Sequence, residues 1–192
     1  SWVTIGHPSV VEVMAQAGFD WLAVDMEHSV IDFHAAQTLI ATIQAQGLVP
    51  LVRVSENHPK IIQRVMDAGA SGVIVPMVNS KIEAEQAVKS VKYPPKGKRG
   101  VGLARAQGYG LKFEEYAAHV NDESVVIVQI EHIDAVDHLE EIVSTEGVDG
   151  VMVGPYDLSG SLGCPGQFDR PSVLAALSRV ETVCRGAEMP LG

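Results

Sequence analysis

The sequence predicts an α/β protein of the (β/α)8 TIM-barrel class, with about six of the eight strands present. Short apolar runs alternate with longer amphipathic segments, and no hairpin signal separates successive runs. This pattern is typical of a parallel sheet with crossover helices. No GxGxxG motif follows the first run, so a dinucleotide-binding doubly wound sheet has no support. The similar joints at 69–73 and 147–151 favour a barrel, and we expect residues 1–192 to form one barrel domain, truncated at its C-terminal end.

Each expected strand is a short apolar run bounded by glycine or polar residues. The run at 125–130 is almost continuously apolar, which suits a strand that is buried on both faces. A further strand is expected to begin near 190–192. The six expected strands are 2–5, 21–24, 49–54, 72–78, 125–130 and 148–153.

The segments between these runs carry apolar residues at helical spacing. Ile61, Ile62 and Val65 share one face of such a segment, and Asp32 and Ser80 can cap the helices that follow them. The expected helices are 8–18, 32–47, 59–69, 80–91, 113–120, 135–146 and 171–185.

A polar, glycine-rich segment (residues 93–112) lies between two of the helices. It lacks the GxxxxGK[ST] pattern of a phosphate-binding loop. A lid, a substrate-gripping loop and a solvated linker all remain open for it.

Composition excludes several classes of partner. The chain has 14 Lys and Arg against 24 Asp and Glu, a net charge of −10, which disfavours nucleic acid and anionic membranes as partners. No apolar run approaches the roughly 20 residues of a membrane span, and no signal-peptide pattern opens the sequence. The two cysteines form no CxxC motif. We therefore expect a cytoplasmic protein without disulfides.

Carboxylates follow two neighbouring expected strands, at the end where barrel enzymes carry their chemistry. Glu131 follows the 125–130 strand and Asp157 follows the 148–153 strand. Two converging carboxylates repel each other unless a cation lies between them. Oxygen ligands suit Mg²⁺ or Mn²⁺. A buried salt bridge to Arg53 and helix capping remain as alternatives.

Other polar residues interrupt or follow the expected strands. Asp25 and His28 follow the second strand, and a carboxylate beside an imidazole is typical of a general base. The alternative is a structural histidine that caps a helix or binds a carbonyl group. Arg53 could bind a substrate carboxylate or enolate, or form an ion pair with Asp25. Glu27 is left open between an oligomer contact and a contact at the barrel bottom.

The lysines and the remaining histidines limit the reaction mechanisms that the sequence supports. None of the seven lysines ends an expected strand, which argues against a Schiff-base mechanism. His7 and His132 lie just past strand ends, and we expect them and the other histidines except His28 to be structural or solvated.

Eight segments of the chain form a recognisable set: AGFDW at 17–21, DMEH at 25–28, VPMV at 75–78, YPP at 93–95, RGVG at 99–102, VQIE at 128–131, EGVDG at 146–150 and GPYDLS at 154–159. Together they resemble the class II 2-keto-acid aldolases of the HpcH/HpaI family, which include 4-hydroxy-2-oxoheptanedioate and 2-keto-3-deoxy-sugar-acid aldolases. The resemblance covers essentially the whole chain in the family's order.

The resemblance implies roles for individual residues. Glu131 and Asp157 would bind the divalent metal, which would be Mg²⁺, Mn²⁺ or Co²⁺. His28, oriented by Asp25, would be the base, and Arg53 would hold the keto and enolate oxygen. The other implied substrate contacts are Gln129, near the metal's water ligands, and the backbone of Gly154, Pro155, Tyr156 and Asp157, at the keto-acid carboxylate.

The resemblance also implies a barrel whose last helix is exchanged between subunits, in a homo-oligomer that is usually a hexamer. Residues 102–109 depart from the form found in the best-known members. The resemblance implies that this loop lies near the aldehyde side of the substrate, so the aldehyde is left open.

The expected reaction is reversible aldol cleavage of a 4-hydroxy-2-keto acid to pyruvate and an aldehyde. Two alternatives are a metal-dependent CoA-thioester lyase of the malyl or citramalyl type, and a non-catalytic keto-acid-binding barrel. A CoA lyase should carry a basic nucleotide groove, and basic residues cluster little outside 96–105. The presence of a base, an arginine and both ligands speaks against the non-catalytic alternative.

Overall fold

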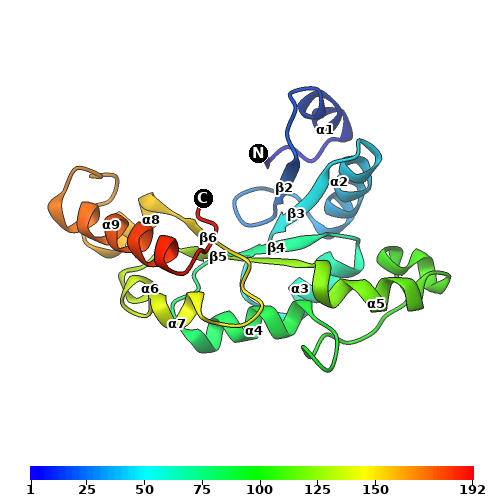
Figure 1. Cartoon of the computed structure of the whole chain (residues 1–192). Coiled ribbons are helices and arrows are strands. Elements are labelled where there is room, and N and C mark those ends of the chain that lie inside the picture. Colours follow the sequence, from blue (N-terminus) through cyan, green and yellow to red (C-terminus); the bar gives the residue numbers. More distant parts are fainter.

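The computed structural model describes all residues, 1–192, and contains one six-stranded parallel sheet. Each strand pairs with the next one in the sequence, which is the order of a barrel. A doubly wound sheet would instead reverse its strand order near the middle. The strands therefore form part of a (β/α)8 barrel (Figure 1), as the sequence predicts. They are β1 (Trp2–Val3), β2 (Trp21–Asp25), β3 (Val49–Arg53), β4 (Gly72–Val75), β5 (Val125–Ile130) and β6 (Gly150–Val153).

Helices connect the strands and cover the outer face of the sheet (Figure 1). The predicted caps are present, because Asp32 accepts a hydrogen bond from the Ala35 amide at 2.8 Å and Ser80 accepts one from the Glu83 amide at 3.3 Å. No helix combines the length and the apolar character needed to cross a membrane. The helices are α1 (Pro8–Ala15), α2 (Phe33–Ala45), α3 (Pro59–Asp67), α4 (Lys81–Val91), α5 (Phe113–Glu123), α6 (Ile133–Asp137), α7 (Leu139–Val143), α8 (Pro155–Ser161), α9 (Pro171–Gly186) and the 3-10 helix η1 (Arg105–Gly110).

The helices differ from the sequence prediction in three places, one of which is the unpredicted 3-10 helix η1. The single helix expected at 135–146 is two short helices, α6 and α7, which meet at His138. Helix α8 was not predicted, although Pro155 occupies its first turn, where proline is favoured. Leu191 forms an isolated parallel bridge with Val151 beside β6, at the place where a further strand is expected to begin.

Alternate residues of each strand face two different environments. On the helix side, residues such as Val24, Val52 and Val128 belong to a buried cluster of 39 residues between sheet and helices. On the barrel side, Ala23 and Leu51 belong to a separate cluster of only three buried residues. The helix side therefore supplies most of the apolar burial that stabilises the fold.

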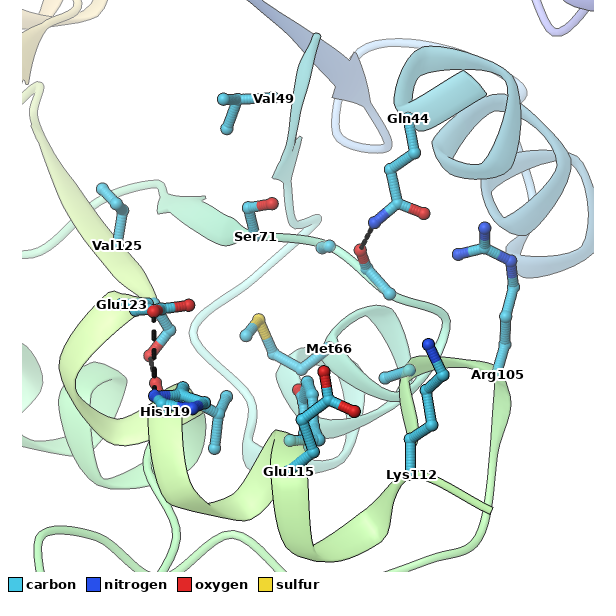
Figure 2. A pocket seen from close by; sticks show the side chains of 16 residues that line it. Gln44, Val49, Met66, Ser71, Arg105, Lys112, Glu115, His119, Glu123 and Val125 are labelled. Carbon is cyan, nitrogen blue, oxygen red and sulfur yellow. Dashed lines mark hydrogen bonds and ion pairs between the residues drawn. The ribbon is translucent and has the colours of Figure 1, made fainter. Parts of the chain in front are cut away.

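The glycine-rich segment lies at the N-terminal ends of the strands. Arg105 from this segment lines a cavity of about 660 Å³ together with Val49, Ser71 and Val125, which lie at or just before the starts of β3, β4 and β5 (Figure 2). Its guanidinium donates to the Ala68 carbonyl at 3.0 Å. The glycine-rich segment is therefore wrongly predicted as a lid or substrate-binding loop for a site in the same copy of the chain. The catalytic end of a barrel is the C-terminal end of its strands, opposite to the end where this segment lies.

A buried arginine attaches this segment to the helices. Arg99 forms an ion pair with Asp67 at 2.6 Å and donates to the Tyr116 hydroxyl at 3.0 Å. Its guanidinium lies 4.7 Å from the centre of the Tyr93 ring. Gln107 is fully buried and donates to the Tyr93 hydroxyl at 2.8 Å. The segment is therefore held by side chains and is not a solvated linker.

Candidate active site

The polar residues predicted for the site lie on the barrel side of their strands. Asp25 follows barrel-facing Ala23 by two residues, and Arg53 follows barrel-facing Leu51 in the same way. Because side chains alternate along a strand, Asp25 and Arg53 point to the same side as those apolar residues. Gln129 lies two residues after Ile127, which packs against the barrel-side cluster. The structure therefore brings these residues together at the C-terminal ends of β2, β3 and β5.

Arg53 and Asp25 form a bidentate ion pair between paired positions of β2 and β3. The Nε and Nη2 atoms of Arg53 donate to Oδ1 and Oδ2 of Asp25 at 2.9 and 2.6 Å. Burial alone would raise the pKa of Asp25, but the bonds from Arg53 and from the backbone amides lower it overall. The ion pair that the sequence left as an alternative for Arg53 is thus present.

The His28 imidazole does not contact Asp25, contrary to the expected base arrangement. Asp25 Oδ1 accepts hydrogen bonds from the backbone amides of Glu27 and His28 at 3.1 and 3.2 Å, in addition to its bond from Arg53. Oδ1 of this carboxylate therefore accepts three hydrogen bonds, from the turn and the guanidinium, and Oδ2 accepts one from the guanidinium. The His28 side chain is 65% exposed, and its Nε2 lies 3.8 Å from Glu27 Oε2.

Glu131 is held by two hydrogen bonds just beyond the end of β5. Its Oε2 accepts from the Met77 amide and its Oε1 accepts from the Gln129 side chain, both at 3.1 Å. Met77 adopts a left-handed conformation with φ of 52°, which is uncommon for a residue other than glycine. Burial raises the pKa of Glu131, and the charge of Asp157 raises it further, although the Met77 amide opposes both effects.

Gly154 makes the approach of β6 to Glu131 feasible. A Cβ atom at this position would lie 2.3 Å from Glu131 Oε1, which is far inside a van der Waals contact. The next residues open helix α8 and place exposed Asp157 in its first turn. The first backbone amides of a helix have no acceptor within it, so those of Tyr156 and Asp157 are free to bind an anion.

The C-terminal ends of the strands form the open end of the barrel, which we call the barrel mouth. The oxygen ligands at the barrel mouth fit a hard divalent cation. Glu131 and Asp157 offer carboxylate oxygens, and the buried Oε1 of Gln129 has no hydrogen-bond partner. An unpaired buried acceptor is costly, and a metal-bound water would satisfy it. No group of three His, Cys, Asp or Glu side chains forms a metal cluster. Water and substrate would therefore have to complete the coordination around the two carboxylates.

The remaining histidine candidates are helix caps. His7 accepts a hydrogen bond from the Ser9 amide and His132 accepts one from the Asp134 amide, both at 3.2 Å. The structural role expected for these two residues is therefore confirmed. The hydrogen bond from the Met77 amide to Glu131 could not be predicted from the sequence, because any residue other than proline has the same backbone donor.

We expect the substitution Gly154→Ala to lower activity roughly 10²-fold, because Glu131 must move away from the added methyl group and small misplacements at a site are costly. The kcat/KM for the expected aldol cleavage is measured by steady-state kinetics, and the affinity for Mn²⁺ is measured by calorimetry. Gly160→Ala is the matched control, because Gly160 lies on the same helix and a methyl group added there would meet no neighbour within 4 Å. Wild-type values for Gly154→Ala would show that Glu131 does not need its observed position.

A barrel with its polar site at the C-terminal ends of the strands is the architecture of an enzyme. Among enzymes of this architecture, two carboxylates and an arginine at the site define the narrower class of those that can use a divalent cation. The chain belongs to the HpcH/HpaI aldolase/citrate lyase family, whose sequence profile matches residues 1–191.

Relatives with names and solved structures support this assignment. A 2-dehydro-3,6-dideoxy-6-sulfogluconate aldolase from Pseudomonas putida is 39% identical, over 100% of this chain and 75% of its own length. A 5-keto-4-deoxy-D-glucarate aldolase from Escherichia coli is 40% identical, over 93% of this chain and 70% of its own length. A family member from Burkholderia cenocepacia superposes with a TM-score of 0.94 at 36% identity, over 100% of this chain and 77% of its own.

Proposed function

We propose that the protein catalyses reversible, divalent-metal-dependent aldol cleavage of a 4-hydroxy-2-keto acid to pyruvate and an aldehyde. The observation that carries the proposal is the buried carboxylate of Glu131 beside Gln129 and Asp157 at the barrel mouth. Two relatives at 39% and 40% identity are named as aldolases of keto-deoxy sugar acids. A carbon–carbon lyase therefore agrees with both the site and the relatives.

Glu131 and Asp157 would hold the cation, which we propose to be Mg²⁺, Mn²⁺ or Co²⁺. When bound, the cation would polarise the keto group of the substrate and make the C3 proton easier to remove. Gln129 can accept a hydrogen bond through its free Oε1. The backbone of Gly154, Pro155, Tyr156 and Asp157 would bind the keto-acid carboxylate at the start of α8.

His28 is proposed as the base that moves the C3 proton of pyruvate. Its imidazole is exposed at the barrel mouth, where a substrate can contact it. Arg53 would stabilise the oxyanion that forms on the keto oxygen, while Asp25 keeps the guanidinium in place. No lysine is assigned a Schiff-base role, because the site contains no lysine at a strand end.

The proposal also includes a homo-oligomer, a hexamer by resemblance, in the cytoplasm. Both cysteines are free and buried, which agrees with a reducing compartment. Analytical ultracentrifugation tests the assembly, and a monomer at micromolar concentration would contradict it.

The reaction is tested by incubating the protein with pyruvate, a divalent cation and a panel of aldehydes, and by identifying products by mass. Aldol products should carry the mass of pyruvate plus aldehyde, and the same products should release pyruvate on reversal. Malyl-CoA and citramalyl-CoA are assayed in parallel. Cleavage of these thioesters with no product from any aldehyde would favour the CoA-lyase alternative.

We expect the substitution Arg53→Lys to lower kcat/KM roughly 10²-fold, because lysine keeps the charge but loses the planar fork that spans Asp25 and a substrate oxygen. Steady-state kinetics measure the effect. Arg185→Lys is the control, because Arg185 pairs with Glu181 on the exposed face of α9. Near-normal activity of Arg53→Lys would reduce Arg53 to a structural partner of Asp25.

A further inference from the structure

Glu27 is a carboxylate at the barrel mouth that the proposed reaction leaves without a role. Its side chain is only 16% exposed. Its Oε2 lies 3.3 Å from Arg53 Nη1 and 3.8 Å from His28 Nε2. Neither contact has hydrogen-bond geometry, so this buried oxygen has no hydrogen-bond partner. This oxygen therefore lies between the guanidinium of Arg53 and the imidazole of His28 and accepts a hydrogen bond from neither.

We propose that Glu27 is the positioning residue that aligns the His28 imidazole with the Arg53 guanidinium. The inference rests on the proposed function, because it concerns how the proposed base and the proposed oxyanion donor are arranged. It replaces Asp25 by Glu27 as the carboxylate that orients the base.

The contacts of Asp25 leave this role to Glu27. Asp25 accepts from Nε and Nη2 of Arg53 and from two backbone amides, so it has no contact with the imidazole. Glu27 instead approaches the remaining arm of the guanidinium, Nη1, and the imidazole Nε2 through the same oxygen. A small rotation of the exposed imidazole would convert the 3.8 Å approach into a hydrogen bond.

The charges around Glu27 support a positioning role. Burial raises the pKa of Glu27, Arg53 and His28 oppose that effect, and the nearby carboxylates of Glu131 and Asp25 reinforce it. A buried carboxylate among like charges is costly unless cations compensate it. The groups that face Glu27 are therefore Arg53 from β3, Glu131 from the end of β5, and Asp25 and His28 from the end of β2.

The test uses Glu27→Gln, which keeps the shape of the side chain but removes its charge, and Glu27→Asp, which keeps the charge but shortens the reach. Exchange of pyruvate methyl protons with D₂O in the presence of Mg²⁺ is followed by NMR. Loss of an orienting partner typically costs about 10- to 100-fold, and we expect that loss mainly in the maximal exchange rate and less in the KM for pyruvate. Glu27→Asp should recover little of the rate, because its shorter carboxylate cannot reach both the Arg53 guanidinium and the His28 imidazole.

A second measurement is independent of turnover. The imidazole ¹⁵N resonances of His28, assigned with the variant His28→Ala, are recorded in the metal-free protein. Glu27→Gln should move them, whereas Glu12→Gln, an exposed position on α1, should leave them unchanged. Unmoved His28 resonances in Glu27→Gln would overturn the inference, as would a wild-type exchange rate. A wild-type protein that exchanges no pyruvate protons would instead contradict the proposed function, and the resonances would still decide the role of Glu27.

Discussion

Glu131→Gln should lower turnover at least about 10³-fold, because several kcal/mol of charge stabilisation disappear with the cation that Glu131 is proposed to hold. Glutamine keeps the size of the side chain and can still accept from the Met77 amide, so the fold should persist. Calorimetric titration with Mn²⁺ should show the loss of binding directly. Chelation of the wild-type protein by EDTA should have the same effect, and addition of Mg²⁺, Mn²⁺ or Co²⁺ should reverse it.

Glu123→Gln is the control for this experiment, because Glu123 is an exposed carboxylate at the end of α5. It should bind Mn²⁺ like the wild type. Full turnover in the presence of EDTA would contradict the assignment to class II chemistry. Borohydride trapping of a pyruvate adduct would contradict it as well, because that result requires a lysine imine.

His28→Ala should slow the exchange of pyruvate methyl protons roughly 10²- to 10⁴-fold, the usual cost of losing a general base. Mn²⁺ and pyruvate should still bind, because Glu131 and Asp157 are unchanged. The experiment follows the methyl signal of pyruvate by NMR in D₂O without any aldehyde, so that it reports proton removal alone. In the wild type this exchange should require the cation.

His34→Ala serves as the matched control, since His34 is an exposed histidine in the first turn of α2 to which no part of the reaction is assigned. Normal exchange in His28→Ala would remove His28 from proton transfer. His132 would be a weak replacement, because its Nδ1 already caps α6 by accepting from the Asp134 amide. Asp25→Asn should also slow exchange, but through Arg53, whose fork loses its charged partner.

The sequence predicts much of this fold because its signals are local. Apolar runs mark the strands, and the polar residues that interrupt or follow these runs, such as Asp25, Arg53 and Glu131, mark the end of the barrel where the site lies. The caps Asp32 and Ser80 are recognisable because each side chain binds an amide only three residues away. These features need no knowledge of distant parts of the chain.

The features that escaped prediction depend on contacts between distant segments or on short-range geometry. Whether Asp25 bonds to Arg53 or to His28 is decided by angstrom-scale positions on two strands, which periodicity does not encode. The left-handed backbone at Met77 is imposed by its surroundings, because its residue type does not favour that conformation. Helix α8 is only seven residues long, too short for a clear apolar period. The cavity lined by Arg105 arises only once the strands and helices are assembled.

The separation of helix-facing and barrel-facing residues has a consequence for evolution and for enzyme engineering. Because 39 buried residues on the helix side form the main core and three form the barrel-side cluster, mutations on the two sides carry different risks. Barrel-facing Met152, which is only partly buried, can be randomised in a library with a smaller expected loss of folded protein than the fully buried Ile74. Substitution at Val73 or Val151, one residue away on the opposite face, removes apolar contacts from the large cluster. New substrate preferences are therefore best sought on alternate residues of the strands.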